Sequence, residues 1–270
     1  MPDRKSRLTF YGVNVDLLSQ QDLVAIAEQA MESRQLVRHT ALNVAKLVNL
    51  TTNAELALDV NSSDIVGIDG MGIVYGLRLF GHGNARRVAG IDLFYALLEH
   101  CAKTGRKPFI LGATQANLER AMDEARRLYP GLTFAGSRNG YFKTEERPAI
   151  VRQIAASGAD CLFVAMPTPH KERFLNAHAA ELGVPFVMGV GGSVDVLAGH
   201  VTRAPLWMQN AGLEWFHRLL QEPRKMIGRY TRTNAAYAVM LARSLLSGDN
   251  PVKPAPAPAY LRESATPLPD

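Results

Sequence analysis

Long hydrophobic runs are missing from this sequence of 270 residues. No stretch offers the roughly 18 apolar residues that a membrane-spanning helix needs, and the start, MPDRKSRLTF, has no apolar segment after its charges. We therefore predict neither a spanning helix nor a signal peptide, and a chain that stays in the cytoplasm. Cysteine is scarce too. Cys101 and Cys161 give neither a disulfide framework nor metal-ligand spacing, and we interpret both as buried thiols.

Asp-x-Asp is also absent. Many nucleotide-sugar enzymes use that pair to hold a divalent cation on a diphosphate. A diphosphate bound by this chain would have to be met by cationic side chains or backbone N–H groups. Arg86, Arg87 and Arg203 are candidates, although an isolated arginine is more often a solvated surface residue.

The net charge of +5 is unevenly distributed. Residues 200–248 contain seven Lys or Arg and two Glu, so this segment carries the whole excess. A basic segment of this kind indicates an anionic lipid surface or nucleic acid as partner.

Apolar runs alternate with helical patterns over residues 105–195. The expected strands are Lys107–Ala113, Leu132–Gly136, Asp160–Met166 and Pro185–Val190, with helices over Gln115–Tyr129 and Pro148–Ser157 and another between the last two strands. Strands that are apolar on both faces, separated by helices, predict a parallel sheet covered on both sides. We therefore expect an α/β fold with a Rossmann-like core and a C-terminal helical appendage.

Three domains follow from these patterns: a core over 1–199, a basic amphipathic appendage over 200–248 and a Pro-rich tail over 249–270 that is disordered or extended. The first hundred residues look mixed. They contain a strand over Leu8–Val15, a helix over Asp22–Glu32, one or two helices over Asn43–Asn61 and a strand over Asp64–Asp69.

Four strand ends carry polar or glycine-rich loops, and ligands of doubly wound sheets bind at such ends. The loops begin at Asp69-Gly70, at Gly112, at Pro167 and at Gly189, the last running through Gly191 to Asp195. A strand-end Asp69 followed by glycine suits a general base, or else a turn or cap aspartate. Asp195 is either a cap or an acceptor for a base or ribose. The Gly189 loop lacks the third glycine of the dinucleotide fingerprint, which argues against a hydride-transfer enzyme.

The segment 212–246 interleaves apolar and basic residues. This pattern is typical of helices that lie at a membrane interface. A helical hairpin packed on the core with a basic solvated face remains an alternative. No recognised module supports nucleic-acid binding, so we expect no nucleic-acid partner.

Taken together, the landmarks resemble the bacterial WecG/TagA/CpsF glycosyltransferases, from about Leu8 to Tyr230. They are Asp69-Gly70-x-Gly72, Arg87-Val88-x-Gly90-x-Asp92, Leu111-Gly112, Gly140-Tyr141-Phe142, Pro169-x-Lys171-Glu172, Gly189-Val190-Gly191-Gly192-x-x-Asp195, Gly199-x-x-x-Arg203-Ala204-Pro205-x-Trp207 and Gly212-Leu213-Glu214-Trp215-x-x-Arg218-Leu219-x-x-Glu222-Pro223-Arg224.

The resemblance implies an inverting hexosyltransferase that needs no metal or other cofactor. Its partners would be a UDP-sugar donor, an undecaprenyl-diphosphate-linked acceptor and the cytoplasmic face of the inner membrane, bound peripherally. Dimers or trimers are also suggested. Such enzymes build exopolysaccharides and other cell-surface polymers.

The resemblance also assigns residues. Asp69 matches the proposed base, and Arg87 matches an arginine near the donor phosphates. Tyr141 and Asp195 match positions lining the nucleotide site. The appendage contributes the matching arginines Arg218, Arg224 and Arg229.

Two departures concern the sugar. The family's Thr-x-Asn is here Ala41-Leu42-Asn43, with Thr40 adjoining, and its Pro-Lys-Gln-Glu is here Pro169-His170-Lys171-Glu172. Lys171 places a cation where the family has an amide. We therefore lean to glucosyl transfer, with N-acetylmannosaminyl or N-acetylmannosaminuronate transfer as alternatives. An inactive nucleotide-sugar-binding scaffold at the membrane is the alternative from another class.

Overall fold

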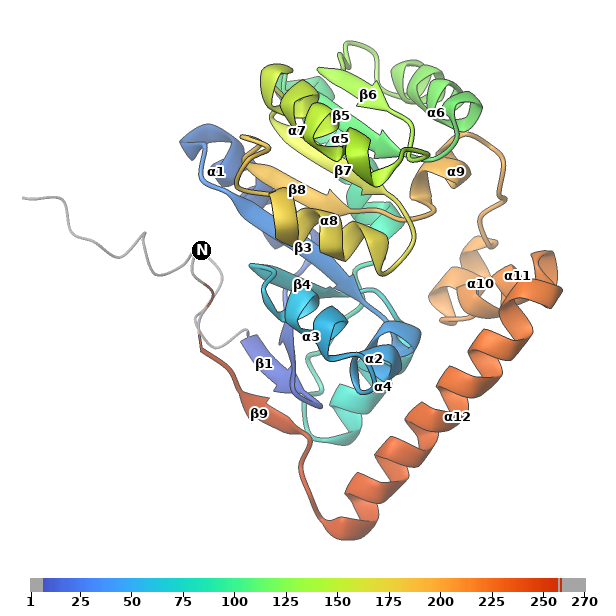
Figure 1. Cartoon of the computed structure of the whole chain (residues 1–270). Helices are drawn as coiled ribbons and strands as arrows, with labels where there is room; N and C mark the ends of the chain where they lie inside the picture. The colour runs from blue at the N-terminus through green and yellow to red at the C-terminus, as the bar shows by residue number, and fades with distance from the viewer. Residues whose placement is uncertain (1–6, 257, 259–270) are drawn as a thin grey trace, which may run out of the picture.

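The computed structural model describes residues 7–256 and 258 (Figure 1). Its centre is a parallel sheet of six strands in the order β4-β3-β8-β7-β5-β6. The strands are β3 (Val37–Leu42), β4 (Ile65–Ile68), β5 (Pro108–Gly112), β6 (Gly136–Arg138), β7 (Cys161–Ala165) and β8 (Phe186–Gly189). The sheet therefore extends beyond residues 105–195, because β3 and β4 come from the first hundred residues.

Helices cover both faces of this sheet. One face packs against α1 (Gln20–Ser33), α5 (Gly90–Thr104), α6 (Gln115–Leu128) and α9 (Ser193–Leu197), and the other against α7 (Arg147–Ala156), which follows the short helix η2 (Thr144–Glu146), and α8 (His170–His178). Alternation along the strands explains the two cores: Ile110 and Phe163 join the first, whereas Phe109 and Leu162 join the second. The predicted α/β Rossmann-like fold is confirmed.

A third apolar cluster lies beside β4. It joins α2 (Val44–Leu50), α3 (Ala54–Asn61) and α4 (Met71–Leu79) to a small antiparallel sheet of β1 (Arg7–Phe10), β2 (Val13–Asp16) and β9 (Val252–Pro254). The single strand expected over Leu8–Val15 is wrong. Tyr11 and Gly12 have φ of 49° and 77°, so the chain turns there and forms a hairpin.

The strand expected over Leu132–Gly136 is also misplaced. β6 begins only at Gly136, which pairs with Phe109. A Cβ on residue 136 would lie 2.7 Å from Cε2 of Phe109, so the ladder forms where glycine leaves room for that ring. Leu132 instead inserts singly into the core.

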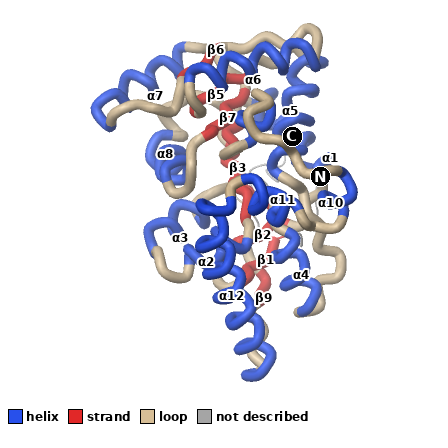
Figure 2. The backbone as a smooth tube through the Cα atoms, turned by 90° about the vertical axis from the view of Figure 1, so that its right-hand side faces the viewer, coloured by secondary structure: helices blue, strands red, loops and turns tan. Residues whose placement is uncertain are grey.

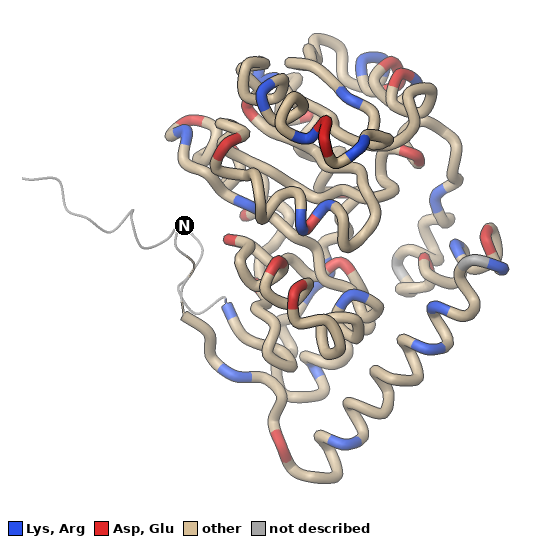
Figure 3. Tube along the Cα trace, in the orientation of Figure 1, with Lys and Arg blue, Asp and Glu red and all other residues tan. Residues whose placement is uncertain are grey.

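The appendage consists of α10 (Leu206–Asn210), α11 (Glu214–Gln221) and α12 (Pro223–Ser247). α12 packs against α2. Figure 2 shows α12 passing α2 and extending to the bottom of the view. The Tyr237 hydroxyl donates to the Gly72 carbonyl at 2.9 Å. Figure 3 shows lysine and arginine positions spaced along this helix.

The Pro-rich tail begins as a strand. β9 pairs with β1 through Leu8–Pro254 and Phe10–Val252, so disorder is the wrong expectation for Val252–Pro254, while an extended backbone is confirmed there. β1 offers an open edge for this pairing, and an extended Pro-rich segment can occupy such an edge. Residues 257 and 259–270 lie outside the described part of the chain.

Candidate active site

The polar loops meet at the carboxyl edge of the parallel sheet. Asp69 follows β4, Asn43 follows β3, and the glycine loop 189–192 follows β8. Thr168 follows β7 and Gly112 ends β5. Since neighbouring parallel strands end at one edge, these loops lie side by side in the order of the strands.

Asp69 is held at three points. Its N–H donates to the Leu42 carbonyl at 2.9 Å, and its Oδ1 accepts from the Gly90 N–H at 2.9 Å, in the first turn of α5. Its carbonyl oxygen accepts from Arg87 Nε at 2.6 Å. Oδ2 accepts no hydrogen bond from the described residues. The positive end of α5 stabilises negative charge here, and Oδ2 is available to a ligand.

Gly70 brings this carboxylate close to Asn43. A Cβ on residue 70 would lie 3.1 Å from Cβ of Asn43. Asn43 Oδ1 caps α2 by accepting from the Lys46 N–H at 3.0 Å, which fixes the side chain and leaves its amide NH₂ without a partner in the described chain. Thr40 is buried within β3, two residues before the strand ends.

Lys46, Lys171, Glu172 and Thr168 form a buried group that we call the lysine cluster. Glu172 Oε1 lies 2.9 Å from Lys46 Nζ and 2.8 Å from Lys171 Nζ. Lys46 also donates to the Ala41 carbonyl at 2.6 Å, and Lys171 donates to Thr168. Glu172 Oε2 is buried without a hydrogen-bond partner among the described residues.

In this cluster, two lysine amines stabilise the charged form of the carboxylate that lies between them. Burial alone would raise the pKa of Glu172, but the charges of Lys46 and Lys171 outweigh it and lower the pKa to about 2. Burial, and then the like charge of Lys46, lower the pKa of Lys171 to about 8, although Glu172 and Asp69 oppose this. Lys171 crosses the end of β8, where a Cβ on Gly189 would lie 3.0 Å from its Cδ.

His39 lies behind this cluster. Neither ring nitrogen has a hydrogen-bond partner within the described chain. Burial, with a smaller effect of Lys46, lowers the pKa of His39 to about 3. The ring fits because residue 67 is glycine, where a Cβ would lie 2.8 Å from Nε2. The imidazole is therefore a neutral core group.

A second set of charges joins the appendage to the core, and we call it the arginine chain. Arg87 pairs with Glu214 of α11, whose other oxygen lies 3.3 Å from Arg203 Nε. Arg203 donates to both oxygens of Asp92 in α5, at 2.6 and 2.9 Å. Because Arg87 and α5 also hold Asp69, the chain connects that carboxylate to the appendage.

The predicted appendage arginines lie in two settings. Arg218 reaches the glycine loop, since a Cβ on Gly192 would lie 3.3 Å from one of its terminal nitrogens. Arg224 and Arg229 lie on the exposed surface of α12. The Arg229 guanidinium lies 5.0 Å from the centre of the Tyr230 ring.

The remaining predicted residues surround the ends of β5 and β8. Gly112 has φ of 136°, and a Cβ there would lie 2.4 Å from the Ala165 carbonyl oxygen, so only glycine fits. Asp195 Oδ1 accepts from the Asn117 amide at 2.8 Å and ties α9 to α6. Tyr141 is 76% exposed. Gly191 has φ of 53°, which suits the turn of its loop.

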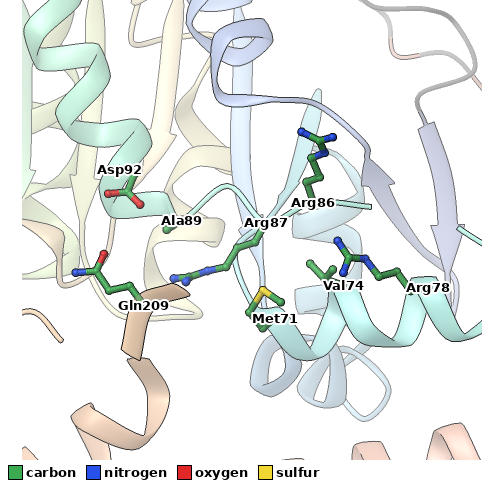
Figure 4. A pocket seen from close by; sticks show the side chains of 8 residues that line it. All are labelled: Met71, Val74, Arg78, Arg86, Arg87, Ala89, Asp92 and Gln209. Carbon is green, nitrogen blue, oxygen red and sulfur yellow. The ribbon is translucent and has the colours of Figure 1, made fainter. Parts of the chain in front are cut away.

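A pocket of about 290 Å³ lies beside Asp69, because Arg87 of its lining donates to the Asp69 carbonyl oxygen. Figure 4 shows its lining: Met71, Val74, Arg78, Arg86, Arg87, Ala89, Asp92 and Gln209. Arg86 and Arg87 diverge from adjacent positions, and Arg87 extends toward Gln209.

Among the described residues, no three His, Cys, Asp or Glu side chains gather in a way that would bind a metal ion. Over the same part of the chain, no helix combines the length and apolarity needed to cross a bilayer.

Lys46 and the pairings within the arginine chain were not predicted from the sequence, although Arg203 was a candidate for binding a diphosphate. Lys46 carries no motif and looks like any polar residue of an amphipathic helix. Glu214, Arg203 and Asp92 stood among the landmarks, so a signal existed, but it did not show that they bind one another.

The sheet and the appendage together match one known protein family. Residues 8–251 match the Glycosyl transferase WecG/TagA/CpsF family, which spans both the parallel sheet and the appendage. The chain therefore belongs to the WecG/TagA/CpsF family of glycosyltransferases.

Proposed function

We propose that this glycosyltransferase moves a hexose-type sugar from a UDP-sugar to an undecaprenyl-diphosphate-linked saccharide, with inversion and without a metal ion. The observation that carries the proposal is Asp69, a fixed carboxylate with one free oxygen at the edge where the loops meet. The products would be intermediates of exopolysaccharides or other cell-surface polymers.

The reaction is a single displacement. The acceptor hydroxyl oxygen forms a bond to the anomeric carbon while the bond from that carbon to the UDP oxygen breaks, and the electron pair leaves with UDP. Asp69 Oδ2 takes the hydroxyl proton. Arg218, Lys171 and the N–H groups of the glycine loop offset the charge that grows on the leaving diphosphate. Asn43, Tyr141 and Asp195 line the donor, and the buried Glu172 positions Lys171 beside it.

The test is Asp69→Asn in a transfer assay with UDP-sugar and a lipid-diphosphate-linked acceptor. Loss of a general base lowers kcat by about 10² to 10⁴. Asp123→Asn, an exposed aspartate of α6, serves as the matched control and keeps full turnover. Full turnover of Asp69→Asn would remove the base assignment. A wild-type protein that binds UDP-sugar without any turnover would instead indicate an inactive scaffold.

For the sugar, we favour glucose. Lys171 adds a cation at the donor side, whereas an amide suits an N-acetyl group better. Parallel assays with UDP-glucose, UDP-N-acetylmannosamine and its uronate test this choice. Faster transfer of either N-acetyl sugar would reject glucose, and Lys171→Gln should shift the relative rates toward N-acetyl sugars.

We also propose peripheral binding to the cytoplasmic face of the inner membrane. Large apolar side chains of the appendage are exposed: Leu206 73%, Trp207 65%, Leu220 62% and Ile227 57%. Basic residues lie among them, as at membrane interfaces. The double variant Arg224→Glu and Arg229→Glu should lower the affinity for anionic vesicles, measured by sedimentation, by a factor of about 30 or more, at about 1 kcal/mol per charge removed. Arg120→Glu on α6 is the control and should leave that affinity unchanged. Unchanged sedimentation would contradict this binding surface.

A further inference from the structure

The pocket beside Asp69 has an unusual combination of walls. Its lining combines Met71 of α4, a partly exposed apolar side chain, with Arg78, Arg86 and Arg87 (Figure 4). Val74 and Ala89 also border the pocket, but both are buried, at 0% and 5% exposure. An accessible methionine among arginines suits a ligand with an anionic head and a hydrocarbon part.

Two of the rim charges are not neutralised by any carboxylate of the described chain. Arg78 donates to the Ala85 carbonyl from Nε at 3.2 Å and from a terminal nitrogen at 2.9 Å, which orients the guanidinium but leaves its charge. Arg86 is exposed and makes neither a hydrogen bond nor an ion pair with described residues. In contrast, Arg87 pairs with Glu214, and Asp92 pairs with Arg203.

The pocket lies apart from the loops that we propose to bind the donor. β4 is the edge strand of the sheet, and the loops after β8, β7 and β5 lie on one side of it. The pocket is built on the other side, from α4, residues 86–92 and α10. Asp69 stands between, because Met71 and Arg87 of the lining adjoin it in sequence or by hydrogen bond.

The size of the pocket favours a small ligand. At about 290 Å³, it lies just below the range of typical ligand sites, which run from ≈ 300 to 1,000 Å³. A diphosphate with the first part of a hydrocarbon chain fits this volume better than a complete nucleotide sugar. The attacking hydroxyl belongs to a sugar bonded to that diphosphate, so the head group must bind one sugar away from the base.

We propose that this pocket binds the diphosphate of the lipid-linked acceptor, with Arg78 and Arg86 on its oxygens and Met71 against the first prenyl unit. The assignment rests on the proposed function, because it names the acceptor side of the same reaction. It makes Arg78 and Arg86 acceptor-binding residues, whereas the glycine loop and Arg218 serve the donor.

Kinetics test the assignment with Arg78→Gln, Arg86→Gln and the double variant. The acceptor is a short-chain prenyl-diphosphate-linked sugar in detergent. Loss of one charge-assisted hydrogen bond should raise the acceptor KM on the order of tenfold or more, while the donor KM stays within about twofold. Arg120→Gln, an exposed arginine of α6, is the charge-matched control with both constants unchanged. An unchanged acceptor KM, or a rise in the donor KM alone, overturns the proposal.

Arg78 supports the Ala85 carbonyl, so its loss can disturb the loop, but Arg86 has no such role, and its variant alone must raise the acceptor KM. Direct binding is measured without catalysis, by calorimetry with geranyl diphosphate, inorganic pyrophosphate and UDP on the wild type and the double variant.

Geranyl diphosphate should bind more tightly than pyrophosphate and lose at least tenfold in the double variant, while UDP binding is retained. Equal binding of pyrophosphate and geranyl diphosphate would reduce the pocket to an unspecific anion site. Loss of UDP affinity would assign it to the donor. Since this measurement needs no sugar transfer, it can fail or succeed independently of the proposed function.

Discussion

The lysine cluster and the arginine chain flank the same carboxylate but differ in exposure. Side chains of the Lys46–Glu172 pair are 6% and 1% exposed, whereas those of the Arg203–Asp92 pair are 23% and 41% exposed. Ion pairs in a low dielectric are strong, costly to break and little affected by salt, while exposed pairs contribute less and are screened. We therefore expect the lysine cluster to be rigid and the ion pairs of the arginine chain to be weaker.

The largest effect should come from Glu172→Gln. This change leaves two buried lysines without their shared carboxylate, which costs about 3–5 kcal/mol of unfolding free energy. Thermal or urea unfolding measures it, with exposed Glu145→Gln as control. The lowered pKa of Glu172 adds a pH signature: the wild type loses this stability as pH falls from 4.5 toward about 2, and the variant does not. Equal stability of both proteins would contradict the cluster's role.

Next in size is an alkaline decline of activity governed by Lys171. Its amine loses charge as pH rises through about 8, so kcat/KM should fall about tenfold per pH unit above that value if the cation acts on the donor. Stability should move the other way. The unfolded chain holds this proton up to about 10.5, so unfolding free energy rises between about 8 and 10.5. Lys171→Gln should remove the decline, and Lys103→Gln should retain it.

A smaller effect is expected from Glu214→Gln, which detaches Arg87 and Arg203 from the appendage. We expect kcat to fall about fivefold to tenfold, while the unfolding free energy changes by about 1 kcal/mol, since Arg87 and Glu214 are only partly buried, at 18% and 20% exposure. Added salt should lower wild-type activity toward that of the variant. Activity that is insensitive to both the substitution and salt would show that the joint does not serve catalysis.

Tyr237→Phe should have the smallest effect. It removes one hydrogen bond to the Gly72 carbonyl, worth about 0.5–1.5 kcal/mol. The loss should appear in urea unfolding and leave the donor KM unchanged. A change in the donor KM without a change in stability would mean that this hydrogen bond positions the site rather than stabilising the packing of α12.

The sequence predicted β4, β5, β7 and β8 because these strands are buried and read as continuous apolar runs. It did not predict β3, where Arg38, His39 and Thr40 interrupt the apolar pattern. It failed at β6, whose start depends on the space that the Phe109 ring requires, and at the hairpin of β1 and β2, where a non-glycine residue adopts positive φ. Both features are set by neighbours distant in the chain or by the turn itself, which periodicity does not encode.

The site was predictable where topology alone brings loops together. Asp69, Gly112 and the glycine loop follow strands, and parallel strands place them at one edge. Lys46 and Glu172 lie 126 positions apart by their numbering, and Arg87 and Glu214 are separated by 127. Such pairs become visible only when the folded chain gives each charge a partner.

The pairing of β9 with β1 makes the two ends of the described chain neighbours, with Leu8 opposite Pro254. Cutting the protein after residue 200 would therefore remove the strand that pairs with β1 and expose the core surface that Tyr237 covers. A truncated protein would lose its proposed membrane contacts and part of its core at the same time. Joining residues 7 and 254 by a short linker and reopening the chain at the exposed turn near Gly131 would preserve every pairing.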